Sequence, residues 1–114
     1  MYRVYLARHF VRLLKPYIKK FRHLEDDLLN VLGNFNASHA QYLGQQLYKI
    51  RIKSRDVPKG KNKSFRVIIY VLKTNKLLTP IVIYFKSDQE DISKKDIKYH
   101  LEMIVAEVER FKIK

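Results

Sequence analysis

The sequence predicts an α+β domain in which amphipathic helices pack on a small, twisted, mainly antiparallel sheet. Residues 47–53, 65–71 and 81–86 alternate apolar and polar side chains with the period of two that is typical of strands. Two stretches before them and one after carry apolar residues at helical spacing. The chain has 114 residues, enough for one core, so we expect residues 1–114 to form a single domain.

The N-terminal part is predicted to be a strand followed by two helices. Residues 2–6 form a short strand, and apolar residues recur at helical spacing from residue 10 to residue 21. Pro16 lies inside that pattern, where it either kinks the helix or begins a second one. Residues 24–32 give another helical pattern that Gly33 is expected to end. The segment from residue 34 to residue 46 is less regular.

The three alternating segments have matching phases, which divides the predicted sheet into two faces. The apolar face consists of Tyr48, Ile50, Ile52, Phe65, Val67, Ile69, Val71, Ile81, Ile83 and Phe85. The cationic face consists of Lys49, Arg51, Lys53, Arg66, Tyr70, Tyr84 and Lys86. We expect the two N-terminal helices to cover the apolar face and to leave the cationic face free.

A last helix is predicted at the edge of the sheet. Ser93 and Asp96 resemble a capping box, with Asp in the place of Glu. The apolar positions of this helix are Ile97, Leu101, Ile104, Val105, Val108 and Phe111. Residues 74–76 are predicted to form the hairpin turn between the second and third alternating segments.

The charge is strongly basic and unevenly distributed. The net charge is 24 − 11 = +13, and all of the basic excess lies in residues 1–24 and 45–76, since the rest of the chain is slightly acidic. Cations on strands in register favour a polyanionic partner, whereas the simpler alternative is a solvated basic surface. The chain has no cysteine, no apolar run of about 18 residues and no signal-peptide pattern, so we expect a cytoplasmic protein without membrane contact. None of the four histidines pairs with another at ligand spacing, so we expect neither a metal nor another cofactor.

Residues 48–51, 59–61 and 65–70, in this order and spacing, resemble the RelE/ParE superfamily of bacterial toxins. The resemblance is strongest to the RelE/HigB-like mRNA interferases, and residues 83–93 resemble the segment after their last central strand. It implies a RelE-like fold and a ribosome-dependent endoribonuclease that cuts mRNA by attack of a 2′-hydroxyl on the adjacent phosphate. It also implies contacts with ribosomal RNA and a cognate antitoxin protein.

Two features depart from the family pattern. Ser64 precedes Phe65 and Arg66, where many relatives have glycine. Some relatives end in a short tail with a catalytic His or Tyr, whereas Tyr99 and His100 lie inside the predicted last helix. The general acid and base are therefore not assigned from the sequence.

Arg66 is the strongest candidate for stabilising charge at a phosphate, because a guanidinium offers it a planar fork. Its alternative role is a salt bridge to a helix acid. Tyr84 would stack on a base or orient the 2′-hydroxyl, or else pack at the rim of the sheet. The predicted catalytic set is Lys49, Arg51, Arg66, Tyr84 and Lys86, the last by correspondence with a polar site position in relatives. The predicted RNA-binding set is Lys53, Arg55, Lys59, Lys61, Lys63 and Tyr70.

Carboxylates and histidines receive a smaller role. Asp88, Glu90 and Asp91 are possible bases by residue type, but we expect them to mark a turn and the start of the last helix. His39, in the irregular segment, is a distant candidate for acid–base chemistry.

Two other functions stay open. A ParE-like toxin would inhibit gyrase without nuclease activity, and the cations Lys49, Arg51, Arg66 and Lys86 argue against it. A non-catalytic RNA-binding domain would bind RNA with strong salt dependence and leave it uncut.

Overall fold

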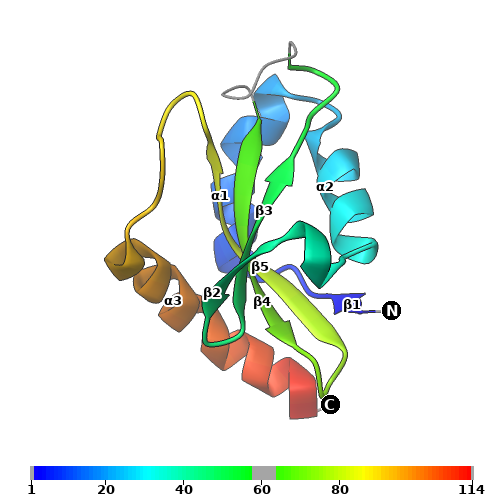
Figure 1. The fold of residues 1–114 in the computed structure, drawn as a ribbon, viewed down its shortest axis with the longest axis vertical. Coiled ribbons are helices and arrows are strands. Elements are labelled where there is room, and N and C mark those ends of the chain that lie inside the picture. The colour runs from blue at the N-terminus through cyan, green and yellow to red at the C-terminus, as the bar shows by residue number, and fades with distance from the viewer. Residues whose placement is uncertain (1, 58–63, 114) are drawn as a thin grey trace.

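A computed structural model describes residues 2–57 and 64–113, with side chains in these ranges up to residue 110. Its elements are β1 (Arg3–Val4), α1 (Arg8–Lys20), α2 (Leu24–Gly33), the 3-10 helix η1 (Ala37–His39), β2 (Gln41–Gly44), β3 (Leu47–Ile52), β4 (Phe65–Leu72), β5 (Leu77–Phe85) and α3 (Lys94–Ile113). The strand order is β1-β5-β4-β3-β2, and β1 is parallel to β5 while the other neighbours are antiparallel. Figure 1 shows α2 to the right of the central strands and α3 to the lower left. The predicted α+β class is confirmed.

Helices α1 and α2 pack on the apolar face of the sheet, as predicted. The rings of Tyr17 and Phe21 on the α1 side each lie 5.2 Å from the ring of Phe65, and the Phe85 ring lies 4.8 Å from it. Such aromatic pairs stabilise a core by about 0.5–1.5 kcal/mol beyond their burial. Because α1 continues through Pro16 to Lys20, the alternative in which this proline begins a second helix is wrong. Helix α2 ends at Gly33, where the predicted stop lies.

The irregular segment from residue 34 to residue 46 contains one strand that the pattern did not predict. Strand β2 pairs with β3, and the turn between them has three successive residues with positive φ: Gly44 at 90°, Gln45 at 51° and Gln46 at 69°. Glutamine is uncommon at positive φ, so the sequence carries little signal for this turn. Most residues of β2 are exposed, so this strand does not need the alternation of apolar and polar side chains that marks a half-buried strand.

The cationic face is not left free, which corrects the expectation that it would be. Leu47, Ile68 and Val82 point to this face and are buried, and Ile104 and Val108 of α3 are fully buried. Helix α3 contacts β5 and α1, and also lines a groove over this face. A long helix with an apolar stripe must bury that stripe, and this part of the sheet is the surface that α1 and α2 leave uncovered. The Ser93 cap is confirmed, with its Oγ accepting from the Asp96 N–H at 3.1 Å, while the Phe111 side chain lies outside the described side chains.

Strand β5 contains a bulge that breaks the predicted alternation. Ile68 pairs with Val82 and Ile69 pairs with Pro80, so Ile81 is an extra residue. Thr79 consequently lies opposite Tyr70 of the cationic face, whereas unbroken alternation from Ile83 would place it on the apolar face.

Polar contacts fasten α3 to the start of the chain. His9 Nε2 lies 2.8 Å from His100 Nδ1, so the fold pairs two histidines that sequence spacing did not bring together. The Tyr5 hydroxyl donates to the Glu107 carboxylate, which also accepts from the Arg8 N–H at 3.3 Å. Within residues 2–57 and 64–113, no three His, Asp or Glu side chains are grouped so that they could hold a metal ion. The same residues contain no helix with the length and apolar character of a membrane span.

The histidine pair predicts that acid destabilises the protein. Burial lowers the pKa of His9 and of His100, and the positive charges of Arg12 and His9 lower them further, while Asp96 acts in the opposite direction on His100. The folded state thus favours the neutral rings. Their contribution to the stability of the fold is therefore complete above pH 6.5, the ordinary pKa of histidine, and is lost as the pH falls below that value. We expect the melting temperature to fall between pH 7.5 and pH 5, as measured by circular dichroism.

The control for this prediction is the double variant His9→Gln, His100→Gln. It keeps hydrogen-bonding groups at both positions but removes both titrating rings, so its melting temperature should depend less on pH. A double variant with the same pH dependence as the parent protein would contradict the prediction.

Candidate functional site

Three predicted site residues form one row across the cationic face. In the register of the sheet, Arg51 of β3 lies opposite Arg66 of β4, and Arg66 lies opposite Tyr84 of β5. Directly opposite residues on antiparallel strands point to the same face, with Cβ atoms about 5 Å apart. Arg51 is exposed, Arg66 is half-buried and Tyr84 is buried. The prediction that these three side chains point to the cationic face is therefore confirmed.

The two arginines have no ion-pair partner among the described residues. The Arg66 guanidinium donates a hydrogen bond to the Ser64 hydroxyl instead of pairing with a helix acid. Burial lowers the pKa of Arg66, and the positive charge of Arg51 lowers it further. Like charges directly opposite each other destabilise a sheet. A pair of unneutralised arginines is therefore suited to hold an anion between or above them.

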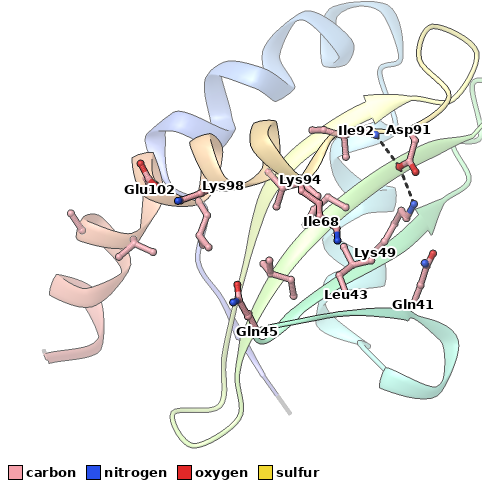
Figure 2. A pocket seen from close by; sticks show the side chains of 15 residues that line it. Gln41, Leu43, Gln45, Lys49, Ile68, Asp91, Ile92, Lys94, Lys98 and Glu102 are labelled. Atoms are coloured by element: carbon pink, nitrogen blue, oxygen red, sulfur yellow. Dashed lines mark hydrogen bonds and ion pairs between the residues drawn. The ribbon is translucent and has the colours of Figure 1, made fainter.

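Asp91 joins this cluster, although the sequence pattern favoured the role of a turn residue for it over that of a base. Its Oδ1 accepts hydrogen bonds from Lys49 Nζ at 3.0 Å and from the Tyr84 hydroxyl at 3.2 Å. The N–H of Ile92 donates to the same oxygen at 2.8 Å. Figure 2 shows the bonds from Lys49 and Ile92 converging on Asp91. Asp91 follows an exposed turn after β5, and its nearness to β3 is a tertiary contact that no local spacing reveals.

The contacts of Asp91 shift two pKa values in opposite directions. The hydrogen bond from the Ile92 N–H, and then that from Lys49, hold the pKa of Asp91 below its ordinary value. Burial, together with the charge and hydrogen bond of Asp91, raises the pKa of Tyr84 to about 12. At neutral pH the cluster thus contains a carboxylate and a protonated phenol beside several cations.

A groove of about 940 Å³ begins at Lys49 and Asp91 and runs between α3 and the strands β2 to β4. Figure 2 shows its two walls, with Lys94 and Lys98 on the helix and Gln41 and Gln45 on the opposite side. Its apolar lining is formed by Leu43, Leu47, Ile68, Ile92, Ile97, Leu101, Val105 and Ala106. The groove therefore combines an apolar floor with a mainly cationic end.

The other predicted residues lie farther from this cluster or have other partners. Lys86 Nζ donates to the backbone carbonyl of Glu90, and Arg55 pairs with Asp27 of α2 at 3.0 Å. Lys53 is exposed just beyond β3. Tyr70 lies four residues after Arg66 on β4, about 13 Å along the strand, and donates to the Gln46 side chain. Lys59, Lys61 and Lys63 lie outside the described residues, and His39 is exposed in η1.

The chemistry open to this arrangement is electrostatic stabilisation and proton donation. Arg51, Arg66 and Lys49 supply positive charge, and Tyr84 supplies a hydroxyl that stays protonated at neutral pH. No described histidine lies among these residues: the histidines at positions 9 and 100 pair with each other, and His23 pairs with Asp56 at 2.8 Å. Proton removal is therefore the step for which the cluster is least equipped.

The sequence model of a family described as "RelE toxin of RelE / RelB toxin-antitoxin system" matches residues 2–112. No curated protein gives a significant match. Among solved structures, a double arginine-to-alanine mutant of the E. coli toxin RelE in the free state is similar, with 19% sequence identity and a TM-score of 0.47. That match covers 78% of this chain and 87% of the other chain.

The unneutralised arginine pair predicts a substitution that increases stability. Replacing Arg51 by Gln removes the repulsion from Arg66 and should raise the free energy of unfolding by about 0.5 kcal/mol. The matched control is Arg55→Gln, which breaks an ion pair with Asp27 and should leave the stability unchanged or lower it slightly. Urea denaturation measures both changes, and an Arg51→Gln variant less stable than the parent would refute the repulsion.

Proposed function

Because this chain belongs to the RelE family of toxins from toxin–antitoxin systems, we propose that it is a ribosome-dependent endoribonuclease that cuts mRNA. The proposal places the phosphate to be cut on the cationic face of the sheet, next to Arg51 and Arg66. A cognate antitoxin would hold the toxin inactive.

The observation that carries the proposal is the pair of arginines facing each other without a carboxylate between them. An arrangement that costs stability is better explained by a ligand than by packing. Guanidinium groups bind phosphate oxygens through two parallel hydrogen bonds, which makes a phosphodiester the anion that best matches this pair. Tyr84 completes the row with a hydroxyl on the neighbouring strand.

In the proposed reaction the 2′-hydroxyl of the RNA loses its proton to water, its oxygen forms a bond to the adjacent phosphorus, and the bond from phosphorus to the 5′-oxygen breaks. Arg66 and Arg51 stabilise the charge that develops on the phosphate, and Lys49 adds a third positive charge. Tyr84 gives its proton to the leaving 5′-oxygen, because an alkoxide is a stronger base than the phenolate of Tyr84 even with the pKa of this phenol raised to about 12.

Proton removal from the 2′-hydroxyl is the weaker part of this machinery, because the pKa of Asp91 is held low. Catalysis then depends mainly on orienting the RNA for in-line attack, which can contribute several kcal/mol. The decoding site of a ribosome would supply that orientation. The exposed cations of α1, which are Arg8, Arg12, Lys15, Lys19 and Lys20, would contact ribosomal RNA through its phosphates.

Arg66→Ala is predicted to lower the rate of cleavage of ribosome-bound mRNA by about 10²- to 10³-fold, because it removes a charge contact to the transition state. Arg110→Ala is the matched control, since it removes the same positive charge from an exposed residue of α3 that belongs to neither the predicted catalytic set nor the predicted RNA-binding set. Circular dichroism checks that both variants fold. Parental cleavage rates in the Arg66 variant would place the active site elsewhere.

We also predict that the purified protein cuts a message efficiently in a stalled translation complex and poorly as naked RNA. The comparison uses one message at equal protein concentrations, with cuts mapped by primer extension. Equal rates would point to a ribonuclease that needs no ribosome. Binding without cleavage in both samples would favour an RNA-binding domain, and neither binding nor cleavage would favour a ParE-like toxin that inhibits gyrase.

A further inference from the structure

One oxygen atom of Asp91 receives three hydrogen bonds from three different kinds of donor. They are the Lys49 ammonium, the Tyr84 hydroxyl and the Ile92 backbone N–H, at 3.0, 3.2 and 2.8 Å. Proteins offer the same combination of a cation, a hydroxyl and a backbone amide to the oxygens of nucleic-acid phosphates. The pocket around this oxygen is therefore built to receive an oxyanion, and a side chain of the protein itself fills it.

The location of this oxygen is as informative as its donors. Lys49 is on β3 and Tyr84 is on β5, with β4 between them. Neighbouring strands lie about 4.8 Å apart, so a group that bonds to both side chains must lie over β4. On β4, Ile68 is opposite Lys49 and Arg66 is opposite Tyr84. The Asp91 carboxylate thus lies over β4 on the cationic face, bonded to Tyr84 of the row that also holds Arg66 and Arg51, where the proposed function places the RNA phosphate.

We propose that Asp91 occupies, in the free protein, the place of an RNA phosphate, and that RNA must displace this carboxylate to bind. The inference rests on the proposed function, because it takes the displacing anion to be the phosphate of an RNA. Asp91 then acts as a positioning residue that lowers the affinity of the site for RNA while it holds Lys49 and Tyr84 in place.

The surroundings of Asp91 allow the exchange without unpacking the core. Its side chain is 64% exposed, and the preceding turn is held by its own backbone through the bonds from the Asp88 and Gln89 N–H groups to the Phe85 carbonyl. Rotation of one exposed side chain frees the Lys49 ammonium and the Tyr84 hydroxyl together. A phosphodiester that arrives can bond to these two groups and also to Arg66, whose guanidinium bonds to Ser64 and makes no ion pair with the carboxylate among the described residues.

The experiment measures the affinity for a short RNA with 2′-O-methyl groups throughout, which cannot be cut by 2′-hydroxyl attack. Fluorescence anisotropy at a fixed low salt concentration compares the parent protein with Asp91→Asn and Asp88→Asn. Asp88 is an exposed carboxylate in the same turn, and Lys49 and Tyr84 donate to Asp91 instead of to it, so its variant controls for the added positive charge. We expect Asp91→Asn to bind about 3- to 10-fold more tightly than the parent, and Asp88→Asn to change affinity less than twofold.

The same comparison in a Lys49→Met variant tests whether the effect depends on the contact between Lys49 and Asp91. In a Lys49→Met protein the carboxylate has lost its cation, so adding Asp91→Asn should improve binding by less than twofold. Equal affinities of Asp91→Asn and Asp88→Asn, or weaker binding by Asp91→Asn, would overturn the inference. Because the readout is binding alone, tighter binding by Asp91→Asn supports the inference even if the protein fails to cut mRNA, which would contradict only the proposed function.

Discussion

The register between β3 and β4 is the constraint on which both the core and the candidate site depend. Side chains alternate strictly between faces, so a slip of one residue would move Ile50 and Ile52 out of the core and bring Arg51 into it. The aromatic cluster around Phe65 on the apolar face opposes such a slip, because its rings pack between α1 and the sheet. The same packing that stabilises the fold therefore aligns Arg51 with Arg66.

Helix α3 gives the cationic face two different parts. Two side chains of the helix, Ile104 and Val108, are fully buried. From Lys94 to Ala106 the helix also lines a groove over this face, whose end is marked by Lys49 and Asp91. Two polar contacts join the helix to α1: His9 pairs with His100, and the Arg8 N–H donates to Glu107. Neither contact involves a residue that lines the groove, so the floor of the groove stays apolar.

Most of the framework could be predicted from periodicity, while the contacts that complete the site could not. The strand phases placed Arg51, Arg66 and Tyr84 on one face because alternation is a local property of the backbone. Asp91 was undervalued because its partner Lys49 is 42 residues away in the sequence, and the pair between His9 and His100 spans 91 residues. Strand β2 was missed because its turn uses glutamines at positive φ. The roles of Lys59, Lys61 and Lys63 stay predictions from charge alone.

The two-residue strand β1 has a consequence for how the protein is made. Arg3 and Val4 pair with Leu77 and Leu78, so the first strand can join the sheet only after about two thirds of the chain has been synthesised. Contacts between such distant segments form slowly, because the entropy of closing the loop must be lost before they contribute. During translation the nascent N-terminal segment, which is rich in cations and apolar groups, therefore lacks its partner strand until β5 has been synthesised. The row of Arg51, Arg66 and Tyr84 is likewise assembled only once β5 has been synthesised, so the candidate site is a late product of synthesis.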